Sequence, residues 1–490
     1  MSQSTQKQAD VTMTEDVVSV ESHGMDSTQP KSKTASFFNV LFAGFALMSD
    51  GYQSGVISFI NLVLSQIYGT EVFNSDMSSR LSYSMFVGCV VGQLGFGLFV
   101  DRIGRKAGLI ATTFLVIFGA ALSAASSGTS PTGLLWMMVI ARGILGVGVG
   151  GEYPCSSVSA GESADEVSSG NRGKLFVLVT NFVIDFGYVV SAIVPTILLA
   201  IFTEDRLEPV WRLSFGLGII PPLSVLYFRL KMADSKQYQK SAMKKHVPYW
   251  LIVKRYWPRI LTVSSIWFIY DFISYPNGVF SSVIIAQVAG NEPMIVTCAW
   301  NILLMAFYLP GCAAACLLVD RIGRKYTLAV GLLSMGIVGM IIGGSYVQLS
   351  QNCFPMFVIL YGLFLALAEM GPGSMIGLIA MESFPTAVRG TGYGIAAAIG
   401  KIGATIGTLA FGPMKQEMGV RGPFLVGSGI AIFASLIAYF FIHEIGPGGL
   451  EEEDEKFRQY LIDNGYDISA MGLTSAKDDT TAKATVTHAE

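Results

Sequence analysis

Twelve long apolar stretches, separated by short polar segments, constrain this chain more than any other feature. A helix needs about 20 apolar residues to cross the hydrocarbon core of a bilayer. The strands of a membrane barrel would instead alternate apolar and polar residues, which these stretches do not do. We therefore expect an all-α membrane protein in which twelve transmembrane helices form two pseudo-symmetric six-helix bundles. The expected helices cover residues 36–64, 81–100, 107–127, 132–160, 173–201 and 210–230, then 259–288, 293–319, 326–347, 353–382, 390–413 and 421–443.

Charged residues make up only 14% of the sequence, against about a quarter in a typical soluble protein. Lysine and arginine concentrate in residues 229–259, between the two groups of helices. Because loops rich in these residues stay in the cytoplasm, we expect this segment and both chain ends to be cytoplasmic. The expected parts are a disordered tail (1–35), a first bundle (36–230), a linker (231–258), a second bundle (259–443) and a tail with a short acidic helix (444–490).

The six cysteines lie in or beside apolar runs and form no Cys-x-x-Cys motif or cysteine–histidine pair. This pattern argues against a disulfide framework, a metal site or a bound cofactor. The apolar runs also contain no pairing of a nucleophile with a base, so we do not expect an enzyme. Nothing in the charge pattern points to nucleic acid as a partner.

The hexapeptide DRIGRK occurs twice, at 101–106 and 320–325, each time between the second and third helix of a group. The two groups are therefore internal repeats, as in transporters that bind their substrate near the bilayer midplane between two halves. We expect the charged residues of both copies to take part in a gate between the halves, although they would also serve as topogenic positive charge. These gate candidates are Asp101, Arg102, Arg105, Asp320, Arg321 and Arg324.

Two acidic residues lie at the cytoplasmic ends of expected helices four and ten. Glu162 and Glu382 are close in sequence to the loop arginines Arg172 and Arg389. We expect these four residues to form ion pairs of the same gate.

Ionisable side chains within membrane helices are costly, so each one is a functional candidate. The aromatic residues Trp267 and Tyr275 flank Asp271 at intervals of four residues, which places all three on one helix face. We interpret this face as a substrate-recognition stripe rather than a packed aromatic surface, and Pro276 with Gly278 indicates a broken helix directly afterwards. The intramembrane charges are Asp50, Arg142, Glu152, Asp185, Asp271, Glu369 and Lys401.

The segment GVGVGGEYP (146–154) combines close-packing glycines with a proline kink. Glu152 and Tyr153 lie at that kink, and we expect both to contact substrate. Arg142 precedes this segment, and we expect it either to assist in binding or to pair with the gate region.

These motifs resemble the phosphate:proton symporters of the major facilitator superfamily. That family carries Gly-x3-Asp-Arg-x-Gly-Arg-Lys, Gly-Gly-Asp-Tyr-Pro, Trp-x3-Asp-x3-Tyr, Gly-Pro-Asn and Gly-Lys. The likeness to fungal glycerophosphodiester permeases is greater, through GFALMSDGY, GEYP, YDFISYPNGVFSS, DRIGRKYTL and TAVRG. It covers residues 40–443, whereas the PESPR and PETKG marks of sugar porters are absent.

The resemblance implies a proton-coupled symporter of the plasma membrane that works by alternating access. This chain has Gly373 where the phosphate pattern has asparagine, and we expect the lost side chain to make room for a larger substrate. Asn181 is the nearest amide to the family's helix-five glutamine. Asp185 and Glu369 would serve an inositol headgroup as hydroxyl acceptors, or a choline headgroup as counter-charges.

We favour glycerophosphocholine as the substrate, with glycerophosphoinositol a close second and inorganic phosphate as the alternative; a non-transporting nutrient receptor is a further alternative. Aromatic faces attract quaternary ammonium groups, and Trp267, Tyr270 and Tyr275 would supply them. Asp50 and Glu152 would carry the coupled proton, while Lys401 would hold the phosphate. The expected partners are the organophosphate, protons and the lipid bilayer, and we expect a functional monomer.

Overall fold

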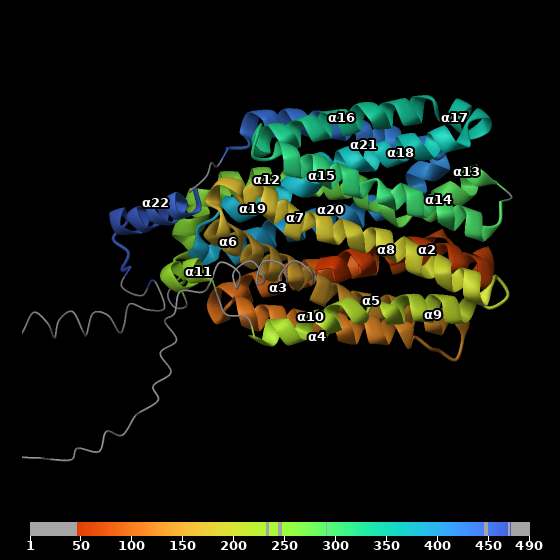
Figure 1. Ribbon diagram of the computed structural model, residues 1–490, viewed down its shortest axis with the longest axis horizontal. Coiled ribbons are helices and arrows are strands. Elements are labelled where there is room, and N and C mark those ends of the chain that lie inside the picture. Colours follow the sequence, from red (N-terminus) through yellow and green to blue (C-terminus); the bar gives the residue numbers. More distant parts are fainter. Residues whose placement is uncertain are drawn as a thin grey trace, which may run out of the picture.

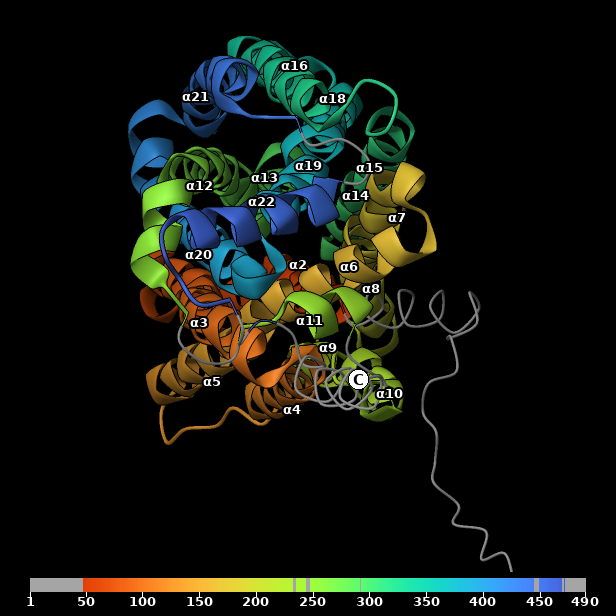
Figure 2. The ribbon, with the colours of Figure 1, turned by 90° about the vertical axis from the view of Figure 1, so that its left-hand side faces the viewer.

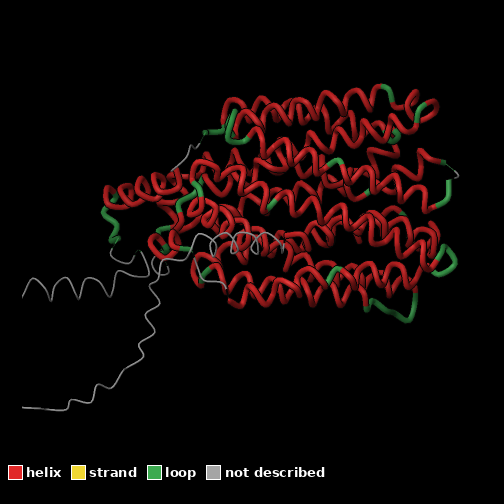
Figure 3. Tube along the Cα trace, viewed as in Figure 1, coloured by secondary structure: helices red, strands yellow, loops and turns green. Residues whose placement is uncertain are grey.

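The computed structural model describes residues 47–231, 235–243, 247–290, 292–444, 449–468 and 471. Within these ranges the chain forms helices and loops, and no strand occurs among the described residues (Figure 3). The predicted first tail (1–35), the start of the first helix and most of the last tail lie outside the described residues.

The membrane-spanning helices of the first half match the expected ranges closely, with several spans built from two or three consecutive elements. They are α2 (Leu47–Val72), α3 (Ser75–Ile103), α4 (Arg105–Ala124), α5 (Pro131–Glu152) with η1 (Tyr153–Ser157) and α6 (Val158–Val167), α7 (Arg172–Val179) with α8 (Asn181–Phe202), and α9 (Leu207–Leu217) with α10 (Ile220–Lys231).

The second half repeats this arrangement. Its spans are α12 (Tyr249–Val279) with α13 (Ser281–Ala289), α14 (Met294–Ala306) with α15 (Tyr308–Leu318), α16 (Arg324–Gly344), α18 (Phe354–Ala368) with η3 (Glu369–Gly373) and α19 (Ser374–Glu382), α20 (Arg389–Met418) and α21 (Arg421–Phe441). Three short helices lie outside the spans: α11 (Lys236–Ser241), α17 (Tyr346–Asn352) and α22 (Gly449–Asp463).

The described residues contain 11 helices long and apolar enough to cross a membrane, or 12 when the bent pair of α12 and α13 counts as one span. The predicted number of transmembrane helices is therefore confirmed. The predicted break is present as well, because α12 and α13 are bent by 51° relative to each other. The linker is shorter than predicted, since α12 begins at Tyr249 rather than near residue 259.

The two halves lie side by side, with the second half above the first in Figure 1. The short helices α11 and α22 lie together at one end of the bundle, which we call the linker end; Figure 2 looks onto it. The helix α22 confirms the acidic helix predicted for the last tail. We call the opposite end, which carries α17, the far end.

Helices α3 and α20 join the two halves through direct backbone contact. A Cβ atom on Gly394 would lie 2.3 Å from the carbonyl oxygen of Gln93, and one on Gly97 would lie 2.8 Å from that of Gly390. Only glycine permits backbones to approach this closely. The surface between the halves is therefore smooth along these two helices.

Corresponding spans of the two halves each contain one π turn. The turn η1 follows Glu152 and contains Pro154, while η3 begins at Glu369 and contains Pro372. Proline removes a backbone donor and disturbs the regular helix, and π turns occur frequently at functional sites. Both turns thus place an acidic residue at an irregular point inside the membrane region.

Candidate transport site

A cavity lies between the two halves. Both halves contribute polar and aromatic side chains to its wall. All predicted substrate-binding residues except Glu152 line it: Tyr153, Asn181, Asp185, Trp267, Tyr270, Asp271, Tyr275, Glu369 and Lys401. The sequence motifs of helices four, five, seven, ten and eleven therefore meet around one space.

One part of the cavity wall, which we call the cationic end, is organised by Lys401. Its ammonium group donates to Asp271 Oδ2 at 2.8 Å and to the Tyr275 hydroxyl at 2.7 Å. The same group lies 4.0 Å from the ring centre of Tyr275 and 5.2 Å from that of Tyr153. Because an ammonium group has three donors, Lys401 can still donate to an incoming anion.

A second part of the wall, the acidic end, is built by Asp185 from α8 and Glu369 from η3. Asn181 donates to Glu369 Oε1 at 3.3 Å and to the Gly373 carbonyl at 2.8 Å. The Tyr270 hydroxyl donates to Glu369 Oε2 at 3.3 Å. The cavity therefore has two chemically opposite ends, one with a free cationic donor and one with two carboxyl groups.

The space above Gly373 is not empty, which corrects our interpretation of this position. A Cβ atom there would lie 2.2 Å from Glu369 Oε2 and 2.7 Å from the Tyr270 hydroxyl. The missing side chain thus makes room for the Glu369 carboxyl group rather than directly for a larger substrate. The Glu369 carboxyl group occupies the space that a side chain at position 373 would take.

Glu152 lies outside the cavity, contrary to our prediction that it contacts substrate. It forms an ion pair with Arg229 at 2.5 Å and accepts hydrogen bonds from Thr112 and Ser156. Both charged side chains are buried, with relative exposures of 2% for Glu152 and 0% for Arg229. Fixed donors occupy both oxygens of Glu152, so neither oxygen is free to contact substrate in this structure.

Arg229 is a residue that sequence reasoning misplaced. We assigned it to the basic segment between the halves, whereas it is buried at the end of α10. The apolar run that precedes Arg229 could have indicated its position. An arginine at the end of such a run can point into the bundle when a buried carboxylate faces it.

Asp50 is buried in α2 without lining the cavity, and neither carboxyl oxygen has a hydrogen-bond partner. It interacts electrostatically with Glu152, Arg229 and Lys401. Asp50 therefore lies within electrostatic reach of both the buried ion pair of the first half and the cationic end of the cavity.

Arg142 is also buried away from the cavity and the gate residues. It donates to the Gln53 carbonyl at 2.9 Å, contacts the Met85 sulfur at 3.2 Å and stacks over Phe215. In this structure Arg142 does not pair with the gate residues.

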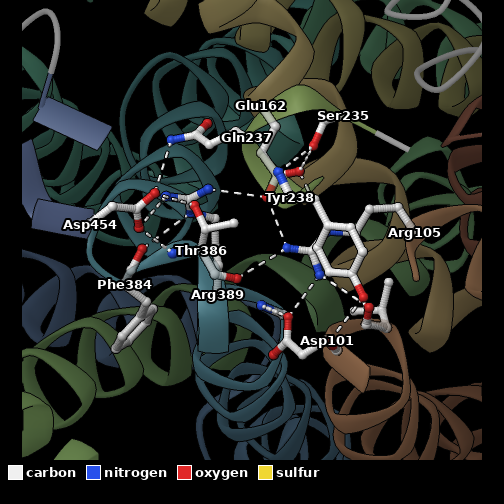
Figure 4. Close-up of polar contacts among 12 residues, drawn as sticks. Asp101, Arg105, Glu162, Ser235, Gln237, Tyr238, Phe384, Thr386, Arg389 and Asp454 are labelled. Carbon is white, nitrogen blue, oxygen red and sulfur yellow. Dashed lines mark hydrogen bonds and ion pairs between the residues drawn. The ribbon is translucent and has the colours of Figure 1, made fainter. Parts of the chain in front are cut away.

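Ion pairs join the two halves at the linker end (Figure 4). Glu162 of the first half accepts from Arg105 of its own half at 2.8 Å and from Arg389 of the second half at 3.1 Å. Asp101 binds Arg105 at 2.8 Å and also accepts from the backbone amides of Gly390 and Thr391. The acidic residue and second arginine of the first hexapeptide thus act together across the interface.

The second hexapeptide makes the corresponding connection. Glu382 of the second half accepts from Arg172 of the first half at 2.7 Å and from Arg324 at 3.3 Å. Asp320 binds Arg324 at 3.1 Å and accepts from the Lys174 amide across the interface. Arg102 and Arg321 lie apart: Arg102 donates to the Tyr249 hydroxyl, and Arg321 is exposed.

The helix α22 extends this network beyond the membrane region. Asp454 accepts from the backbone amide and hydroxyl of Thr386, at 2.6 and 2.7 Å, and lies 4.0 Å from Arg389 (Figure 4). At the far end Ser58 of α2 contacts Ser281 and Ser282 at 2.9 Å, and Glu204 of the first half accepts from the backbone amide of Met294 at 3.0 Å. The cavity is enclosed between these two sets of contacts.

The described residues bring two carboxyl groups and one thiol from three spans together. Oxygen atoms of Asp185 and Glu369 and the sulfur of Cys312 all lie within 4.8 Å of one another. Sequence spacing gave no sign of this group, since its members lie on three separate spans. All six cysteines are free, and only Cys353 is exposed.

Comparison with known proteins gives consistent results along the whole membrane region. The sugar (and other) transporter family matches residues 39–247 and 239–457. The glycerophosphoinositol permease 1 of Candida albicans is 41% identical over 90% of this chain and 86% of its own length. The glycerophosphocholine permease of the same yeast is 38% identical over 91% of this chain and 86% of its own length.

Among solved structures, the proton:xylose symporter XylE has a TM-score of 0.74 at 20% identity, over 87% of this chain and 100% of that structure. This likeness shows the shared fold. The inorganic phosphate transporter PT2 of Toxoplasma gondii is more distant, at 26% identity over 83% of this chain and 72% of its own length. The chain therefore belongs to the sugar (and other) transporter family of the major facilitator superfamily, and it is a membrane transporter rather than an enzyme.

Proposed function

We propose that this transporter is a plasma-membrane symporter that imports glycerophosphodiesters together with protons. The observation that carries the proposal is the cavity with two opposite ends, one cationic and one acidic. A glycerophosphodiester has an anionic phosphate and a distinct headgroup, so each part has a chemically suitable end. The relatives named as glycerophosphoinositol and glycerophosphocholine permeases support the same substrate class.

The phosphate would bind at the cationic end. Lys401 supplies the positive charge and its unused donor, while Tyr153 and Tyr275 flank it. Because Lys401 already neutralises Asp271, an arriving phosphodiester adds uncompensated negative charge. Uptake of one proton compensates that charge, which is the physical reason for symport.

Asp50 is the favoured carrier of that proton. Its buried carboxyl group has no hydrogen-bond partner, and an ionised carboxylate in such a place is costly. The Glu152 ion pair and Lys401 lie within electrostatic reach of Asp50. A change in its protonation would therefore influence the residue that holds the phosphate.

The headgroup would bind at the acidic end, and glycerophosphocholine is the favoured substrate. Asp185 and Glu369 offer negative charge to a quaternary ammonium group. The rings of Tyr188 and Tyr308 stack 5.3 Å apart on the same cavity wall and add aromatic faces. Glycerophosphoinositol is a close second, because carboxyl groups also accept hydrogen bonds from hydroxyl groups.

Inorganic phosphate is the alternative substrate, since it would require only the cationic end. Competition in proteoliposomes distinguishes the two functions. Labelled glycerophosphocholine should accumulate under an inside-alkaline gradient, and an uncoupler should abolish the accumulation. Stronger competition by inorganic phosphate than by either diester would overturn the diester assignment, and uptake insensitive to the uncoupler would overturn proton coupling.

Alternating access would use the two sets of contacts that enclose the cavity. The ion pairs of Glu162 and Glu382 close the linker end, which we take to be cytoplasmic together with both chain termini. The serine contacts close the far end. All of these residues belong to one chain, so a monomer suffices for the cycle.

A further inference from the structure

Two carboxyl groups from opposite halves face each other at the acidic end. Oxygen atoms of Asp185 and Glu369 lie within 4.8 Å of each other, and the side chains are only 1% and 6% exposed. One oxygen of Asp185, Oδ2, is buried without any hydrogen-bond partner, although Asp185 lines the cavity. The pair therefore has an unpartnered oxygen on a residue that lines the cavity.

No cation offsets this pair among the polar and titratable groups that surround it in the described structure. The surrounding groups are Cys312, Cys316 and Tyr308 of α15, Tyr270 and Asp271 of α12, Asn181 and Tyr188 of α8, and Ser374 of α19. All of them are neutral or acidic. Lys401 is engaged by Asp271 at the other end of the cavity.

Two carboxylates this close in a buried site do not both stay ionised without a compensating charge. The compensation is either one proton held between them or a cation placed beside them. The two compensations exclude each other, because a proton removes the negative charge that would attract a cation. A neutral polyol requires neither change, since a protonated carboxyl group donates and accepts hydrogen bonds.

We propose that the Asp185–Glu369 pair holds one proton when the acidic end is empty, and that a quaternary ammonium headgroup displaces it. A polyol headgroup binds with the proton in place. The displaced proton returns to the aqueous side from which the diester enters, so the choline diester is carried with one proton fewer at this site than the inositol diester. This inference rests on the proposed function.

Equilibrium binding to the purified protein between pH 5 and pH 8 tests the exchange. Binding of labelled glycerophosphocholine and of labelled glycerophosphoinositol is measured in parallel. The quantity followed is the dissociation constant of glycerophosphocholine divided by that of glycerophosphoinositol. Protonation at the cationic end, where the phosphate binds, changes the affinity for both diesters alike, so its effect cancels in this ratio. Acidification should weaken binding of the choline diester relative to binding of the inositol diester. The change should be at most about tenfold per pH unit, which is the limit for exchange of a single proton.

The double variant Asp185→Asn/Glu369→Gln removes both carboxyl groups and with them the exchangeable proton. It should weaken glycerophosphocholine binding more than glycerophosphoinositol binding and flatten the pH dependence of the ratio of their dissociation constants. Glu71→Gln and Asp76→Asn, at exposed positions of α2 and α3, are matched controls that should behave as wild type.

Each outcome has a distinct meaning. A ratio that stays constant with pH in the wild-type protein would overturn the proton–headgroup exchange while leaving the diester function in place. If acidification still weakens binding of the choline diester relative to the inositol diester in the double variant, the exchange is also overturned. Absence of binding by either diester, with binding of inorganic phosphate, would instead overturn the proposed function.

Discussion

Each half of this transporter buries an ion pair in its membrane-spanning region, and the two pairs differ in how fully their oxygens are occupied. In the first half, both oxygens of Glu152 accept from Arg229, and Thr112 and Ser156 donate as well. In the second half, Lys401 binds one oxygen of Asp271, while the other oxygen is buried without a partner. The first pair is complete, whereas the second has capacity left for a ligand.

This difference separates two roles that look alike in sequence. A charged side chain in a membrane helix is by default a functional candidate, and both carboxylates satisfied that rule. The number of fixed partners and the position relative to the cavity distinguish them. We infer that the first pair stabilises the bundle and that the second pair binds substrate.

The largest expected effect is loss of transport on changing the second pair. Lys401→Gln removes the charge that holds the phosphate; truncating one member of a buried charge pair costs about 2–5 kcal/mol, so transport should fall at least about 30-fold. Asp271→Asn should also cripple transport with normal surface protein. Uptake of labelled diester at matched expression measures both effects. Lys415→Gln, further along α20, is the control, and full activity of Asp271→Asn would refute the assigned site.

Changing the first pair should affect stability instead. Arg229→Met leaves Glu152 buried without its counter-charge, which costs about 3–5 kcal/mol. The double variant Arg229→Met/Glu152→Gln should recover much of the loss because no charge remains. Thermal unfolding of the purified protein measures these changes. If the double variant is stable but does not transport, the comparison between the two pairs fails.

A third set of ion pairs, those that cross between the halves, should give a smaller effect on access. Glu162→Gln weakens its bonds to Arg105 and Arg389, each charge-assisted bond being worth about 1.5–3 kcal/mol. A cysteine introduced at Ser157 in the cavity wall should then react about tenfold faster with a thiol reagent added at the linker end. Glu452→Gln, which affects an exposed pair with Lys456, is the control. Unchanged labelling would show that this ion pair does not limit opening.

The smallest expected effect concerns a single hydrogen bond of the first pair. Thr112→Val removes one of the donors to Glu152, which should lower the free energy of unfolding by about 0.5–1.5 kcal/mol. Transport should remain near the wild-type rate. A marked loss of uptake at unchanged stability would mean that the first pair takes part in the transport cycle.

The fold was largely predictable because the spans are long and strongly apolar, and the hexapeptide repeat revealed the two halves. All charged residues of the cavity wall were predicted, and the spacing of Trp267, Asp271 and Tyr275 correctly placed them on one helix face, whereas lining residues such as Tyr188 and Tyr308 were not predicted. The partner of Glu152 was not predictable, since Arg229 lies in another span and its inward direction depends on tertiary packing. For the same reason, the space filled by Glu369 above Gly373 could not be read from the chain.

The backbone contact between α3 and α20 has a consequence for the kinetics of transport. At Gly97 and Gly394 the two backbones meet with no side chain between them, and the polar contacts that must break lie beside this seam, where Asp101 accepts from the amides of Gly390 and Thr391. Because the ion pairs at the linker end are buried, dissolved salt screens them little. Turnover should accordingly respond more to removal of these polar partners than to a change in ionic strength.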